Sequence, residues 1–128
     1  MIKICTSIEQ SKKLLSLGLD PNTADMHYED CTETFKLHAS PSEYGYEYNI
    51  PAWSLAALLE LVPVCIKDDN YFFVIEKYAT YLDESIWRVS YKHFSKEDAI
   101  VERHAPLINA AFEMVCWLIE QGHIKVNK

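Results

Sequence analysis

The stretch A-P-L-I-N-A-A-F-E-M-V-C-W-L-I-E-Q-G, residues 105–122, decides the fold of this chain. At 3.6 residues per turn, Asn109, Glu113 and Glu120 fall on one narrow stripe, and apolar side chains occupy the rest of the circumference. The proline suits the first turn of a helix, and Gly122 suits the position after its end. A helix that is apolar nearly all round must be covered nearly all round, so we expect the rest of the chain to pack against it.

Two further helices are predicted before this stretch. Thr6 and Glu9 have the spacing of a capping box, which predicts a helix over about residues 7–17. Ser54 is a suitable N-cap for a second helix, which is short and strongly apolar and which Pro63 ends. This second helix is expected to pack against the C-terminal one.

The remaining segments have the period of two that is typical of strands. Residues 31–38 and 44–50 alternate in polarity on either side of a proline-containing interruption, which predicts a hairpin. Residues 71–81 and 86–94 are rich in aromatic and β-branched side chains and predict a second hairpin. Residues 123–126 are expected to form a terminal strand.

These elements predict a single α+β domain over residues 1–128. Its core is expected to be an antiparallel sheet of four or more strands, with about three helices packed mainly on one face. A chain of 128 residues is long enough to bury a substantial core, and only three glycines and five prolines leave little sequence for long linkers.

The charge and the cysteines exclude several classes of protein. A formal net charge of −7 argues against a general nucleic-acid-binding surface and against adsorption to anionic membranes. An acidic mimic of nucleic acid stays open as an alternative, although the acids are scattered along the chain. We expect no secretory signal and no transmembrane segment, because charged residues interrupt the apolar runs. The wide spacing of Cys5, Cys31, Cys65 and Cys116 is typical of reduced thiols in a cytoplasmic protein and predicts neither a zinc site nor a disulfide framework.

Candidate chemistry is limited to histidines near carboxylates. On a strand, Asp25, His27 and Glu29 would share one face and could contribute to a divalent-metal site. Such a site needs three or four ligands, and no further cluster has a diagnostic spacing, so a polar strand edge is the preferred interpretation and no metal or cofactor is expected. His93 and His104 also lie near glutamates in the sequence. Convergence of these five residues in the fold would favour catalysis, and dispersal would favour a binding role.

Three tyrosines form the most distinctive surface candidate. Tyr44, Tyr46 and Tyr48 would lie on one face of the strand predicted over residues 44–50. Aligned in this way, they would form an amphipathic platform for a partner protein or for stacking a ring. Ordinary packing within the sheet is the alternative.

Several stretches together resemble a known family. They are residues 4–15, 22–26, 51–55, 57–61 and 110–118, with sequences that include I-C-T-S-I-E-Q-S-K-K-L-L, N-T-A-D-M, P-A-W-S-L and A-A-F-E-M-V-C-W-L. The set is similar to a family of small uncharacterised proteins that recur in Bacteroidetes genomes, often in prophage-like regions. The resemblance implies a cytoplasmic accessory role in phage or mobile-element biology, and it carries no catalytic residue over to this chain.

The sequence thus predicts a non-enzymatic, cytoplasmic interaction protein that contacts another protein or a second copy of itself. The alternative is a small-molecule-binding or metal-dependent hydrolytic domain that uses the region around His27 or the tyrosine strand. The two hypotheses differ in whether titratable side chains gather in a pocket.

Overall fold

A computed structural model describes residues 3–31, 34–43, 45–46, 49–67, 70–79, 85–93, 100–104 and 106–126. The elements follow one another as α1 (Ile8–Ser16), the 3₁₀ turn η1 (Pro21–Thr23), β1 (Met26–Cys31), β2 (Thr34–His38), β3 (Asn49–Ala52), α2 (Leu55–Leu61), β4 (Cys65–Ile66), β5 (Tyr71–Ala79), β6 (Ser85–Lys92), β7 (Ile100–His104) and α3 (Leu107–Glu120). The chain therefore has the predicted α+β composition.

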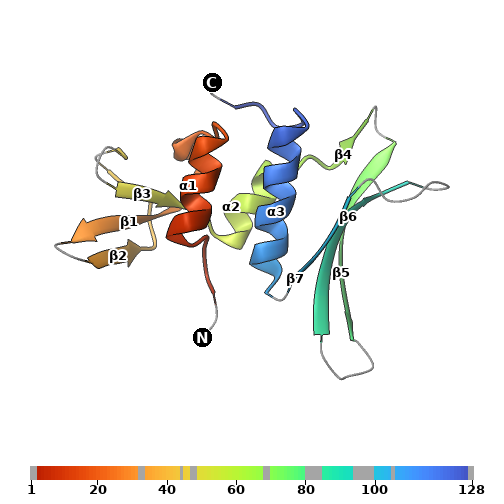
Figure 1. Ribbon diagram of the computed structural model, residues 1–128, viewed down its shortest axis with the longest axis horizontal. Helices are drawn as coiled ribbons and strands as arrows, with labels where there is room; N and C mark the ends of the chain where they lie inside the picture. Colours follow the sequence, from red (N-terminus) through yellow and green to blue (C-terminus); the bar gives the residue numbers. More distant parts are fainter. Residues whose placement is uncertain are drawn as a thin grey trace.

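The strands divide into two antiparallel sheets. The first has the order β2-β1-β3, and the second has the order β4-β5-β6-β7, in which β4 is a pair of residues. The helices lie between the two sheets (Figure 1). The expectation of one sheet with helices mainly on one face is therefore wrong. A helix that is apolar all round needs cover from two sides, and one sheet covers only one of them.

The C-terminal helix is enclosed as predicted. Nine of the fourteen residues of α3 are buried. Phe112 and Val115 belong to a cluster with α1 and α2, whereas Met114 and Leu118 belong to a cluster with the second sheet. Gly122 has φ +79°, the positive value expected after a helix end. Among the described residues, no helix has both the length and the apolar character needed to cross a membrane.

The N-terminal cap lies one residue later than the sequence predicts. Ser7 caps α1, and the capping box is completed by Gln10, whose side chain accepts a hydrogen bond from the Ser7 N–H at 3.0 Å. The Thr6 hydroxyl instead faces inward and accepts a hydrogen bond from the Trp53 N–H at 3.1 Å. The predicted N-cap of α2 is confirmed, because the Ser54 side chain accepts from the third residue of that helix.

The first hairpin differs from the prediction in its turn position. The segment expected as one strand over residues 31–38 belongs to two strands, because the chain reverses between the paired residues Cys31 and Thr34. The partner of β3 is β1, and β3 begins only at Asn49. The inward-facing positions change from even numbers in β1 (Met26, Tyr28) to an odd number in β2 (Leu37), and the prediction of one strand over residues 31–38 overlooked this change of phase.

The second hairpin is confirmed as β5 and β6, with Phe73 opposite Tyr91 in the register. Residues 100–104, for which no strand is predicted above, add β7 to this sheet. The predicted terminal strand over residues 123–126 is wrong. Its apolar side chains Ile124 and Val126 pack against the helical core instead of pairing with a strand.

Candidate functional site

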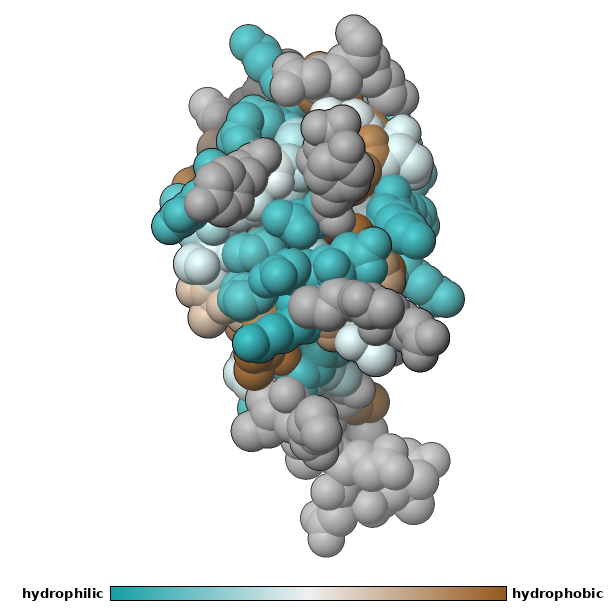
Figure 2. All heavy atoms as spheres, turned by 90° about the vertical axis from the view of Figure 1, so that its left-hand side faces the viewer, coloured by the Kyte–Doolittle hydropathy of each residue, from teal (hydrophilic) through white to brown (hydrophobic). Residues whose placement is uncertain are grey.

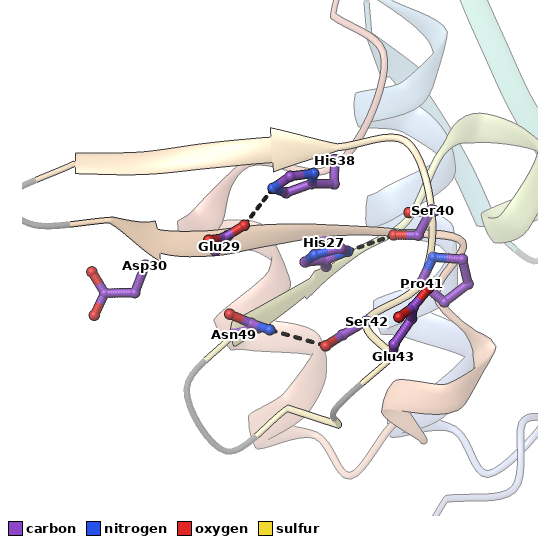
Figure 3. Close-up of a pocket in the computed structure, with 9 residues that line it drawn as sticks. All are labelled: His27, Glu29, Asp30, His38, Ser40, Pro41, Ser42, Glu43 and Asn49. Atoms are coloured by element: carbon purple, nitrogen blue, oxygen red, sulfur yellow. Dashed lines mark hydrogen bonds and ion pairs between the residues drawn. The ribbon is translucent and has the colours of Figure 1, made fainter.

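A surface hollow of about 440 Å³ lies on the face of the first sheet that is turned away from α1 (Figure 3). We call it the histidine hollow. Figure 2 shows this end of the molecule, where hydrophilic side chains predominate among the described residues. The lining residues come from the three strands and from the loop between β2 and β3: His27, Glu29, Asp30, His38, Ser40, Pro41, Ser42, Glu43 and Asn49.

His27 is the most deeply placed titratable side chain of the hollow. The residue is only 9% exposed, and its Nδ1 lies 2.5 Å from the carbonyl oxygen of Ser40. A carbonyl oxygen can only accept a hydrogen bond, so Nδ1 carries a hydrogen, and in the tautomer with that single hydrogen Nε2 is an acceptor. Among the described residues, no group donates a hydrogen bond to this Nε2. One acceptor of a nearly buried ring is therefore available to a donor from outside the chain.

His38 contributes a second imidazole, which stacks on the His27 ring. The register of β1 and β2 places His38 opposite His27, and the two rings stack with centroids 4.7 Å apart and an interplanar angle of 9°. His38 Nε2 also lies 2.6 Å from Glu29 Oε2. The pair is partly exposed and contributes little to stability, but it fixes the His38 ring and orients the Glu29 carboxylate.

The loop side of the hollow contributes polar groups. Asn49 Nδ2 donates to the Ser42 hydroxyl at 2.9 Å, and the Ser42 backbone N–H donates to the Tyr46 hydroxyl at 3.4 Å. Tyr46 lies in a bend before β3, and Tyr44 and Tyr48 lie outside the described residues. The tyrosine platform therefore stays a prediction, and the described tyrosine serves to hold the loop.

Asp25 lies apart from the other two residues of its predicted cluster. His27 and Glu29 line the hollow, but the Asp25 carboxylate accepts hydrogen bonds from the Ser54 backbone N–H, at 2.9 Å, and from the Ser54 hydroxyl. These contacts connect the start of the first sheet to the N-terminus of α2. Asp25 therefore has a structural role here.

The other histidine candidates lie in the second sheet. The His93 ring contacts Tyr71, with centroids 5.1 Å apart, and the backbone of His104 lies in β7. Neither joins the residues of the first sheet. Over the described part of the chain, no three histidine, cysteine or carboxylate side chains are placed to hold a metal ion. Among the described side chains, Cys5, Cys65 and Cys116 form no disulfide with one another.

A second surface of interest lies at the opposite end of the molecule. In Figure 1, β5 and β6 extend past the N-terminal end of α3. On the helix-facing side, Val89 is fully buried, but its cross-strand neighbour Ile75 is 37% exposed. Lys77 Nζ lies 5.2 Å from the ring centroid of Trp87, which is half-buried. We call Ile75, Lys77 and Trp87 the hairpin face.

The sequence pattern gave no sign that His38, Glu43 and Asn49 share a site with His27 and Glu29. The missing information was the turn between β1 and β2. When the turn is placed between Cys31 and Thr34, alternation puts His38 on the same sheet face as His27. Glu43 carries no comparable signal, because it reaches the hollow from an irregular loop.

Comparisons with protein-family models, with curated proteins and with solved structures gave no match to this chain. The site is therefore interpreted from its own geometry.

Proposed function

We propose that this protein is a non-enzymatic, cytoplasmic interaction protein that associates with a second copy of itself through the hairpin face. The observation that carries the proposal is an apolar side chain that β5 exposes on its helix-facing side. Ile75 is 37% exposed on the helix-facing side, opposite the buried Val89, and Lys77 Nζ lies 5.2 Å from the ring centroid of the half-buried Trp87. Removal of such apolar surface from water by a partner lowers the free energy of the system and so favours association.

The distribution of charge favours a second copy as the partner. Of the charged residues of β5 and β6, Lys77 lies on the hairpin face, whereas Glu76, Arg88 and Lys92 lie on the other face of the sheet. The histidine hollow carries three carboxylates and neither lysine nor arginine. Two chains with a net charge of −7 therefore repel one another less at the hairpin face, where the only charged residue named is a lysine, than at the histidine hollow. A two-fold contact also uses the same patch on both copies, which suits an apolar patch because it needs no complementary charge.

The test is the molar mass in solution as a function of concentration, measured by analytical ultracentrifugation. We expect a dimer that dissociates on dilution, and we expect Ile75→Glu to raise the dissociation constant by about tenfold or more. The matched control is Ile4→Glu, because Ile4 is 56% exposed and lies outside the hairpin. A monomer at every concentration, or an equal effect of the two substitutions, would reject the proposal.

A further inference from the structure

The histidine hollow is acidic. Three of its nine lining residues are carboxylates, namely Glu29, Asp30 and Glu43, and none is lysine or arginine. Among the described residues, neither Asp30 nor Glu43 forms an ion pair. The chain as a whole is also acidic, at −7. An anionic ligand would be repelled here, whereas a cation would lower the electrostatic free energy of the hollow.

The hollow also presents hydrogen-bond acceptors that lack donors. His27 is nine-tenths buried, and its Nδ1 is used by the Ser40 carbonyl, which leaves the Nε2 acceptor without a described partner. The Asn49 NH₂ group donates a hydrogen bond to Ser42, and the Asn49 side-chain carbonyl oxygen is an additional acceptor. Figure 3 shows that these groups come from β1, β3 and the loop, around one side of the sheet. A ligand with several N–H donors in different directions satisfies such a set best.

We propose that the histidine hollow binds a guanidinium group, either of a free arginine-like molecule or of an arginine side chain in a peptide. A guanidinium carries five N–H donors in a planar fork that matches a carboxylate such as Glu43, and it is more weakly hydrated than an ammonium. The volume of about 440 Å³ lies within the range of small-ligand pockets and accommodates a group of this size. This inference goes beyond self-association, because it concerns the other end of the molecule.

A metal ion is the competing cation. The structure disfavours it because His38 and Glu29 are directed at one another, 2.6 Å apart, instead of at a common point with His27. In the described part of the chain no metal-binding group of three such side chains was found. A guanidinium needs no such convergence, since its donors spread over several ångströms.

The experiment is an NMR titration of the full chain that follows the His27 ring signals and the backbone amides of Ser40 and Ser42. The probes are L-arginine and a short acetylated, amidated peptide with one arginine, which distinguish the free molecule from the peptide as the source. L-citrulline is the neutral isostere, L-lysine tests the shape of the cation, and Zn²⁺ tests the metal alternative. We expect saturable shifts with arginine or with the peptide, and at least about fivefold weaker binding of citrulline and lysine.

The matched variants are Glu43→Gln and Glu9→Gln, which remove the same charge inside and outside the hollow. Both glutamates are exposed, so neither substitution threatens folding. Glu43→Gln should weaken arginine binding by about fivefold or more, and Glu9→Gln by less than about twofold. The inference is overturned by an absence of shifts with either arginine probe, by equal binding of citrulline or lysine, by equal effects of the two variants, or by shifts with Zn²⁺ alone. Because dimerisation is measured separately with Ile75→Glu, failure here leaves the proposed self-association standing.

Discussion

The two sheets are attached to the helices in different ways. The second sheet and α3 share a buried apolar cluster of six residues: Ile66, Val89, Tyr91, Ala110, Met114 and Leu118. The corresponding cluster of the first sheet has three buried residues, Cys5, Met26 and Ala52, and two of these are small. Since hydrophobic stabilisation grows with the apolar area buried, the second sheet contributes more of it than the first.

At the first sheet, hydrogen bonds to the helical layer compensate for the smaller buried apolar cluster. The Tyr28 hydroxyl donates to the Thr6 carbonyl at 2.8 Å, the Trp53 N–H donates to the Thr6 hydroxyl at 3.1 Å, and the Ser54 N–H donates to Asp25 at 2.9 Å. These contacts attach the inner face of the first sheet, and the start of β1, to the segments that precede α1 and α2. The outer face of the first sheet does not pack against the helices and carries the histidine hollow. The second sheet instead carries the hairpin face, which is partly apolar.

The largest effect is expected from a cavity under the second sheet. Leu118 is fully buried in the cluster between α3 and β6, and Leu118→Ala should lower the free energy of unfolding by about 3 kcal/mol. Met26→Ala removes a side chain of similar size from the smaller cluster, where fewer buried neighbours surround it, and should cost about 2 kcal/mol. Urea denaturation measures both, with the exposed Ile4→Ala as the control. Equal costs for Leu118 and Met26 would contradict the contrast between the sheets.

The same contrast explains which parts of the fold could be predicted from the sequence. The enclosed helix was predictable because a circumference of apolar side chains has only one physical solution, which is burial, and nine of fourteen residues of α3 are indeed buried. The hairpin of β5 and β6 was predictable for a related reason, since aromatic and β-branched residues dominate both strands.

The first sheet was harder to predict because its polarity is similar on both sides of the turn. Cys31 pairs with Thr34, so the inward-facing positions change from even numbers in β1 to odd numbers in β2, but the prediction treated residues 31–38 as one straight strand. That error hid the stacking of His27 and His38 and therefore the histidine hollow. The division into two sheets was equally hidden, because periodicity gives the faces of strands but not which strands are neighbours.

The next effect in size concerns the polar attachment of the first sheet. Asp25→Ala removes the acceptor of the Ser54 backbone N–H and of its hydroxyl, at the N-terminus of α2. A lost charge-assisted cap contact of this kind should cost about 2 kcal/mol. Asp30→Ala is the matched control, because Asp30 is exposed and should change stability by less than about 0.5 kcal/mol.

Hydrogen exchange locates the effect of Asp25→Ala. We expect faster exchange in β1, β3 and the first turn of α2, with little change in β5 and β6, because the Asp25 contacts join the first sheet to α2. Equal acceleration in both sheets would mean that the two ends unfold together and that the difference in attachment has no energetic consequence.

The smallest effect is a loss of stability at alkaline pH. Burial raises the pKa of the Cys116 thiol from 9.0 to about 12, because the thiolate is poorly solvated there. Burial also raises the pKa of Tyr91 in the second sheet and, together with a hydrogen bond to Cys5, that of Tyr28 in the first. In each case the pKa in the folded state exceeds that in the unfolded state. The stabilisation is therefore complete below pH 9 and declines as the pH rises toward 12.

Between pH 8.5 and 10 the Cys116 thiol should account for a decrease of about 1 kcal/mol in the free energy of unfolding, measured by urea denaturation at each pH. Cys116→Ala should remove most of this slope, whatever its effect on stability at neutral pH. Above pH 10, Tyr91→Phe and Tyr28→Phe separate the two ends of the molecule, because each variant removes the phenol of one sheet. A stability that stays constant or increases over this range would show that these groups ionise as readily in the folded chain as in the unfolded one. In that event the burial assigned to α3 and to both sheets would have to be revised.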